Sequence, residues 1–353
     1  MRKKEVNLFS AQPAEKEKKT RRFRLPAGRF AACIACAAAL IFAFAFALPR
    51  AGFSEGKFAG EQNYKCIVNV WHIDSFEGGV GSRAEFLLRR AAEFEKKRTG
   101  VFVMVTALTA ENARERLAAG ELPDAISYGY GLEFSDFSPV DTERESPFGS
   151  AGGDVYAVPW CMGGYAVLSR GELPAGQALE NAVVSKGKTT QPYAALALSG
   201  YTLRDYTEKS PLDAYYCFVS GGADVLVGTQ RDINRLFSRD EEAFVTPLGG
   251  YNDLYQYFSI TSSSAEKKAY AEEFIDYVLS DGVQAEISRL GMFSPYRELS
   301  FSAEGLENLQ KERHARGISA FLPARTYAEF SSLSRRAAEG NGAALKKIEN
   351  LLA

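Results

Sequence analysis

Three strand-like segments alternate with two helix-like segments between residues 66 and 131. The first two strands are predicted over "CIVNVWH" and "VFVMVTAL", and the helix between them covers "SRAEFLLRRAAEFEKKR". Ser82 and Glu85 have the spacing of a capping box, and Gly100 ends this helix. A short helix from Thr109 and a strand in "PDAISYGYG" follow. This order predicts an α/β fold with a parallel sheet, whose ligands bind at the carboxyl ends of the strands.

The chain has 353 residues, enough for one large domain or two ordinary ones. Its net charge of −2 conceals an asymmetry, because residues 1–50 carry 11 Lys and Arg against 3 Asp and Glu. The remaining residues carry 31 basic and 41 acidic side chains, a net charge of −10. This acidic body argues against nucleic acid as a partner, since nucleic-acid binding depends on Lys and Arg at the phosphates.

An uncharged apolar run, 30–48, follows a basic tail, 1–29. A run of this length can cross a bilayer, which takes about 20 residues. Basic residues before such a run keep that end in the cytoplasm, so we expect the body on the extracellular side of the membrane. The run is predicted to be an uncleaved signal anchor or a signal peptide cleaved near 45–47, with a buried helix of a soluble protein as the remaining alternative. Residues 49–63 form a polar linker to the globular part.

The glycines after the first strand partly match a dinucleotide-binding fingerprint. Gly79 and Gly81 have the right spacing, but six residues separate Gly79 from the end of the strand at His72. The second strand also lacks the acidic residue that would bind a ribose. We therefore do not expect a dinucleotide, and no cofactor is predicted. The glycines are interpreted as a turn or as a wall of another kind of ligand cleft.

Signals for catalysis are few. His72, Asp74 and Glu77 lie close together in the sequence and could bind a metal or act as acid and base, although their spacing matches no known site. The alternative is that His72 is bonded locally at the end of a strand. Cys66, Cys161 and Cys217 allow at most one internal disulfide outside the apolar run.

Aromatic residues at predicted strand ends and in glycine-flanked loops are the stronger signal. Sugar rings present apolar faces that stack on aromatic rings, while their hydroxyls need polar partners. Each aromatic residue could instead be part of the core. The set comprises Trp71, Tyr128, Tyr130, Trp160, Tyr165 and Tyr251.

Four segments in order resemble the extracellular solute-binding proteins of bacterial ABC importers, in particular the sugar-type class with the type II periplasmic binding protein fold. These are the stretch from "VNVWHIDSFEGGVGSRAEF" onward, "LPDAISYGYG", "VYAVPWCMGGYAVLS" and "VLVGTQRDINRL". The later "AYAEEFIDYVLSDGVQAEISRLGMFSPY" resembles the closing helices of that class.

The resemblance implies two α/β lobes around a ligand cleft. Lobe one would comprise 64–158 and 254–353, and lobe two 159–253. Strands near Val155–Pro159 and Gly249–Tyr257 would act as hinges. Lobe two is shorter than is usual in the family, and the stretch from Arg170 to Pro211 is reduced.

The family's ligand contacts carry over best to Trp71 and Glu77 on one side of the cleft. On the facing side they map to Trp160, Tyr165 and Tyr251, and further contacts are expected from Thr229 and Arg231. Tyr128 is also predicted to contact the ligand, because it belongs to the aromatic set described above.

The resemblance implies a monomeric receptor, not an enzyme, that captures a sugar or oligosaccharide and delivers it to an ABC permease. The alternatives are a sensor of the same fold, an adaptor whose cleft has decayed, and a hydrolase using Asp74, Glu77 or His72.

Overall fold

A computed structural model describes residues 65–132, 136–146, 148–312 and 315–352, all within one compact unit, Asn63–Ala353. The predicted basic tail, the apolar run 30–48 and the linker lie outside the described residues. Within the described part of the chain, no helix combines the length and the apolar character needed to cross a membrane.

The first sheet contains the predicted parallel core. β1 (Cys66–Ile73) pairs in parallel with β2 (Val101–Leu108) on one side and with β3 (Ala125–Tyr128) on the other. β14 (Tyr255–Ile260) runs antiparallel to β3, and β6 (Val158–Met162) runs antiparallel to β14. The order is therefore β2-β1-β3-β14-β6, and the three strands predicted from the sequence are confirmed.

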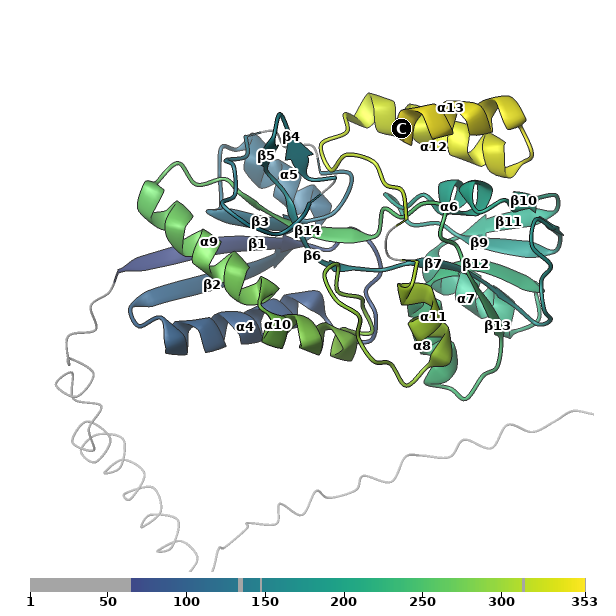
Figure 1. Cartoon of the computed structure of the whole chain (residues 1–353), viewed down its shortest axis with the longest axis horizontal. Coiled ribbons are helices and arrows are strands. Elements are labelled where there is room, and N and C mark those ends of the chain that lie inside the picture. Colours follow the sequence, from purple (N-terminus) through teal and green to yellow (C-terminus); the bar gives the residue numbers. More distant parts are fainter. Residues whose placement is uncertain (1–64, 133–135, 147, 313–314, 353) are drawn as a thin grey trace, which may run out of the picture. The chain divides into compact units, whose positions relative to one another are not determined.

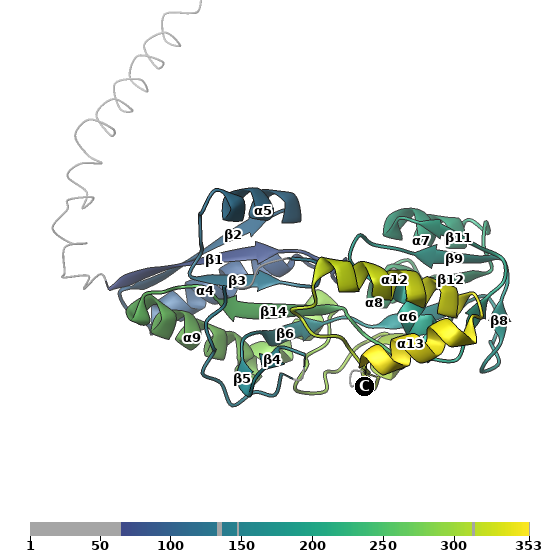
Figure 2. The same ribbon diagram turned by 90° about the horizontal axis from the view of Figure 1, so that it is seen from above.

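Helices cover both faces of this sheet. α4 (Arg83–Lys97) and α9 (Ala265–Leu279) pack on one face, and α5 (Ala110–Ala118) lies on the other (Figures 1 and 2). The predicted cap of α4 is present, because the Ser82 side chain accepts a hydrogen bond from the Glu85 backbone. This bond satisfies one of the free N–H groups at the start of the helix.

The second sheet has the order β11-β9-β12-β7-β13. β9 pairs in parallel with β11 and β12, while β7 is antiparallel to β12 and β13. Its strands are β7 (Tyr165–Ser169), β9 (Ala182–Ser185), β11 (Tyr206–Lys209), β12 (Val225–Thr229) and β13 (Phe244–Pro247). The helices within this part of the chain are α6 (Pro192–Leu198), α7 (Pro211–Val219) and α8 (Gln230–Phe237). Two short pairs complete the strands, β4 (Ser150–Ala151) with β5 (Asp154–Val155) and β8 (Ala178–Leu179) with β10 (Thr202–Leu203).

The chain crosses between the sheets at Gly163–Gly164 and again at 248–254. The first crossing lies later than the predicted Val155–Pro159, because β6 still pairs with β14 through Met162. A Cβ on Gly163 would stand 2.4 Å from the side-chain oxygen of Gln230, so a larger residue at this crossing would displace the Gln230 amide.

The carboxyl-terminal helices depart from the predicted domain division, which placed 254–353 wholly in lobe one. α10 (Asp281–Gln284) and a 3-10 helix (Ala285–Leu290) follow α9, with Ile287 and Leu290 in the core of the first lobe. Three later helices pack instead on the second lobe: one on α8 and β13, and two on α6 (Figure 1). They are α11 (Glu304–Gln310), α12 (Ala324–Ala338) and α13 (Gly342–Leu352).

Candidate functional site

A cleft lies between the lobes, where the parallel strands β1, β2 and β3 end. Its two adjoining pockets have volumes of about 340 and 420 Å³, within the range of small-molecule sites. Both are lined by Asp74 and Ser75 from the loop after β1 and by Lys188 from the second lobe. The remaining lining residues are Ile73, Leu108, Thr109, Ala110, Glu111, Arg114, Gly129, Tyr130, Gly131, Leu132 and Thr189 in the first pocket, and Phe76, Glu77, Gly78, Gly81, Ser82 and Arg83 in the second.

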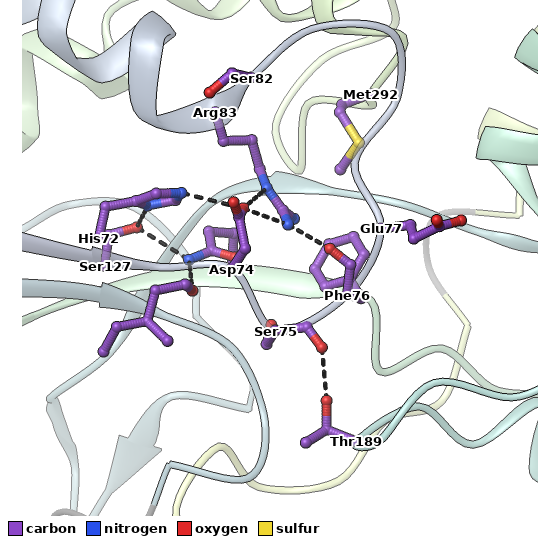
Figure 3. A network of polar contacts seen from close by, with 12 residues as sticks. His72, Asp74, Ser75, Phe76, Glu77, Ser82, Arg83, Ser127, Thr189 and Met292 are labelled. Atoms are coloured by element: carbon purple, nitrogen blue, oxygen red, sulfur yellow. Dashed lines mark hydrogen bonds and ion pairs between the residues drawn. The ribbon is translucent and has the colours of Figure 1, made fainter. Parts of the chain in front are cut away.

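The first-lobe wall is held by a polar network around Asp74 (Figure 3). Arg83 donates from Nε to Asp74 Oδ1 at 2.7 Å, and from Nη2 to the Phe76 carbonyl. His72 Nε2 lies 3.2 Å from the same Asp74 oxygen, and His72 Nδ1 lies 3.0 Å from Ser127 Oγ. The loop after β1 is thereby tied both to the start of α4 and to β3.

Two further donors fix the tautomer of His72. Ser127 Oγ accepts hydrogen bonds from Trp160 Nε1 at 3.0 Å and Gln256 Nε2 at 3.2 Å. The Ser127 hydroxyl therefore donates to His72 Nδ1, which leaves the proton of the neutral ring on Nε2, facing Asp74. Ser127 has no exposed surface, so this Ser–His–Asp arrangement offers no accessible nucleophile.

The pKa values of this network follow from burial and charge. Burial lowers the pKa of His72 by more than its bond to Asp74 raises it, so the ring is neutral at pH 7. Burial by itself would raise the pKa of Asp74. The hydrogen bond from His72 and the charge of Arg83 outweigh it and hold this pKa well below its usual range. The network therefore positions the loop with an ionised carboxylate and a neutral imidazole.

The glycines of the loop serve close packing. A Cβ on Gly79 would stand 1.8 Å from the Leu290 carbonyl oxygen, and the Val80 N–H donates to that same oxygen. This contact agrees with the sequence argument against a dinucleotide loop, since Gly79 meets the chain's own backbone.

The second lobe contacts this wall directly. Thr189 donates to the Ser75 carbonyl at 2.7 Å (Figure 3), and Gln230 donates to the Glu77 carbonyl at 3.3 Å. Arg235 forms an ion pair with Glu77 at 2.9 Å. A second ion pair joins Lys188 to Glu111 at 2.8 Å, with both side chains largely exposed. The described conformation is therefore one in which the lobes touch across the cleft.

Behind the second-lobe wall lies a buried carboxyl, Asp253. Tyr165 donates to its Oδ1 at 2.6 Å, while its Oδ2 has no hydrogen-bond partner among the described residues. Burial raises the pKa of Asp253 to about 6, against the smaller opposite effects of the Tyr165 bond and the charge of Lys186. This carboxyl is thus partly protonated near pH 6.

The five aromatic residues among the predicted ligand contacts are all buried in this conformation. Trp160 is fully buried, stacks on Phe86 at 5.9 Å and donates to Ser127. Tyr165 is bonded to Asp253, and Tyr251 packs against Phe330. Their exposed fractions are Trp71 6%, Tyr128 1%, Trp160 0%, Tyr165 1% and Tyr251 0%. They form layers behind the cleft walls, and a stacking role with solute stays a prediction.

Of the three polar residues predicted as contacts, one lines the cleft and two lie at the start of α8. Glu77 lines the cleft and is partly exposed. Thr229 caps α8 in a capping box with Asp232, and Arg231 follows on the same helix. Burial, together with the neighbouring charge of Arg235, lowers the pKa of Arg231.

Other lining residues escaped sequence reasoning, among them Arg83, Arg114, Lys188 and Thr189. One signal for Arg83 was present, because a cation in the first turn of a helix opposes the helix dipole and needs a compensating carboxylate. Nothing in the sequence placed Lys188 opposite the first lobe.

A larger cavity of about 660 Å³ lies against the hinge strands β6 and β14. Phe148, Tyr255, Tyr257 and Tyr296 contribute aromatic surface to it, and Arg316 contributes an exposed guanidinium. None of the predicted contact residues lines this cavity.

Among the described residues no group of three or more His, Cys, Asp or Glu is arranged to hold a metal ion. The three cysteines Cys66, Cys161 and Cys217 are free thiols. The possible disulfide is therefore not formed in this structure.

Solved structures of sugar-binding proteins share this architecture. The sugar-binding protein MalE from Xanthomonas citri superposes with a TM-score of 0.57 at 16% identity, covering 81% of this chain and 96% of that one. The galacto-N-biose/lacto-N-biose I-binding protein of an ABC transporter from Bifidobacterium longum gives 0.53 at 14%, covering 82% and 96%. The GacH receptor of Streptomyces glaucescens, solved unliganded and with acarbose, gives 0.52 at 14%, covering 82% and 99%.

No protein-family model matches the sequence, and no curated protein matches it. At these identities the likeness establishes the fold. The chain has the two-lobe α/β fold of sugar-type solute-binding proteins, as the sequence resemblance predicted.

Proposed function

We propose that this protein is an extracellular solute-binding receptor that holds a carbohydrate-like solute in the cleft between its lobes and delivers it to an ABC permease. The observation that carries the proposal is the cleft itself. It lies at the carboxyl ends of parallel strands, where ligands of such sheets bind, and residues of both lobes line it. The work is binding and release, with no bond made or broken.

Closure would couple binding to transport. The contacts of Thr189, Gln230 and Arg235 with the loop after β1 form only when the lobes meet. A solute that touches both walls adds to these contacts and shifts the population towards the closed state. Of the predicted contacts, Glu77 would bind solute hydroxyls directly, and Thr229 and Arg231 would shape the second-lobe rim.

The amino-terminal segment belongs to the same proposal. The apolar run 30–48 would tether the monomeric receptor at the outer surface of the membrane, or would direct its secretion if it is cleaved. Either arrangement keeps the two lobes on the side where solutes are captured.

A calorimetric titration of the full chain in mild detergent tests the proposal. The probes are neutral monosaccharides, neutral oligosaccharides, uronic acids and amino sugars, and bound solute should also raise the melting temperature. A solute at 100 times its dissociation constant stabilises a fold by about 2.7 kcal/mol.

Two variants locate the site. Glu77→Gln alters the interlobe cleft, and Arg316→Gln makes a matched change in the hinge cavity. We expect binding to weaken in the first variant and to persist in the second. The reverse result would move the site to the hinge cavity, and no binding by any folded variant or by the parent would reject the receptor function.

A further inference from the structure

The acidic side chains that line the cleft already have cationic partners. Asp74 is bonded to Arg83 and to His72, and Glu77 is paired with Arg235. Glu111 is paired with Lys188. A cationic solute would have to compete with these side chains for every carboxylate in the two pockets.

Several donors, in contrast, remain available. Arg114 donates one hydrogen bond, from Nη2 to the Gly131 carbonyl at 2.9 Å, and forms an ion pair with none of the described carboxylates. Lys188 is 87% exposed, and its pair with Glu111 is of the weak surface kind. Ser75 lines both pockets, and its hydroxyl, buried against Gly129, has no hydrogen-bond partner among the described residues.

Aromatic surface for a neutral sugar is scarce in this part of the structure. Phe76 and Tyr130 are the aromatic residues lining the two pockets. The guanidinium of Arg83 lies over the Phe76 ring at 4.2 Å. Tyr130 is 5% exposed, and its hydroxyl is bonded to Tyr257 and to the Ile318 carbonyl. Recognition in the cleft therefore depends on polar and charged groups more than on stacking.

We propose that the solute carries a carboxylate, as a uronic acid does, and that this carboxylate binds between Arg114 and Lys188 with the Ser75 hydroxyl nearby. The inference rests on the proposed solute-binding function. Arginine retains its charge at all accessible pH values and offers paired N–H donors that fit a carboxylate. Exchanging the exposed partner of Lys188 for a solute carboxylate costs little, because that ion pair is solvated.

Matched probes separate charge from shape. Glucuronate and glucosamine share the ring of glucose and each differ from it at one substituent, at C6 and at C2 respectively, and galacturonate with galactose repeats the first comparison. We expect the full chain to bind one uronate at least tenfold more tightly than its neutral counterpart, and the margin to shrink as salt is raised.

Two substitutions with the same charge change test the assignment. Arg114→Gln should weaken uronate binding about tenfold, as expected for loss of a charge-assisted hydrogen bond. The affinity for neutral sugars should stay unchanged. Arg89→Gln, on the exposed face of α4, serves as the control and should leave uronate binding unchanged.

The outcomes are distinct. Equal or tighter binding of the neutral or amino sugar would overturn the inference while supporting the receptor function. Uronate binding that survives Arg114→Gln would overturn the assigned position. Absence of binding by every probe to a folded protein would reject the receptor function, and the inference with it.

Discussion

On the first-lobe wall of the cleft, Asp74 is bonded to a guanidinium and an imidazole, whereas on the second-lobe side Asp253 is bonded to a phenol and leaves one oxygen without a partner. The pKa of Asp74 is held well below its usual range, and that of Asp253 is raised to about 6. Asp74 also keeps 57% of its side chain exposed, while Asp253 is buried. Charge pairing therefore favours the ionised carboxylate in the first wall. Burial without an ion pair disfavours ionisation of the carboxyl behind the second wall.

The difference suggests which wall keeps its shape when the lobes separate. The loop after β1 has its own anchors within the first lobe, in Arg83, His72 and Ser127. The segment 186–191 is connected through Thr189 and Lys188 to the opposite lobe. Opening would therefore break the contacts of the second wall and leave the network of the first intact.

The largest expected effect concerns the layer behind the first wall. Trp160→Ala removes a fully buried ring that stacks on Phe86 and donates to Ser127, and it should lower the free energy of unfolding by about 3–5 kcal/mol. Chemical denaturation measures the loss, and Trp160→Phe, which keeps most of the ring volume, should lose less. Unchanged stability together with lost solute binding would instead make Trp160 a cleft residue.

A smaller effect is expected at the anchor of the loop. Arg83→Met keeps the length of the side chain but removes its bonds to Asp74 and to the Phe76 carbonyl, with an expected loss of about 2 kcal/mol. Hydrogen exchange of the amides in 74–82 should become faster, while exchange in 186–191 should stay as before. If both segments changed equally, the two walls would not be independent.

The pH dependence of stability should differ between the titratable groups of the two walls. A carboxyl whose pKa is raised by folding contributes most stability below pH 4, and the contribution is lost as pH rises through about 6. Asp253→Asn should therefore stabilise the protein at pH 8, by about 1 kcal/mol, and flatten this decline. Asp232, whose pKa burial likewise raises to about 6, adds to the same trend in the parent protein.

His72, in the first wall, has the opposite sign. Its folded pKa is lowered, so its contribution is complete above pH 6.5 and is lost as pH falls. Stability profiles of the parent and of Asp253→Asn from pH 4 to 8 should differ by the contribution of Asp253, because both proteins keep His72. An identical profile for the parent and the variant would contradict the assignment to Asp253.

The smallest effect is expected at the exposed ion pair. Lys188→Gln removes the bridge to Glu111 and should change stability by less than about 1 kcal/mol, because exposed pairs contribute little. Thermal unfolding at low and high salt measures it, with Lys346→Gln on α13 as a control. A loss of several kcal/mol would mean that this contact, and not Thr189, holds the lobes together.

Local sequence patterns predicted the parallel strands and α4 because each depends on neighbours in the chain. Ser82 caps the helix as its spacing indicates, and Gly100 adopts a φ of 88° where the helix has ended. The resemblance to solute-binding proteins supplied the two-lobe arrangement, which the likeness to solved structures supports.

The burial of the aromatic residues could not be predicted in the same way. Trp160 and Tyr165 lie on strands with every residue buried, so the alternation that separates core from cleft is absent. Nor does the sequence indicate that α11, α12 and α13 pack on the second lobe. Their apolar faces specify that they pack, while the choice of surface depends on shapes formed by residues far away in the chain.

Met162 and Tyr255 lie opposite each other on adjacent antiparallel strands, at the places where the chain leaves and re-enters the first sheet. Partners of this kind are about 5 Å apart, close enough for a tight turn to join them. The segment 163–254, which forms the sheet of the second lobe, is thus inserted between two neighbouring strands of the first. The length and sequence of this segment can therefore change, in evolution or by protein engineering, without altering the register of the strands on either side of it.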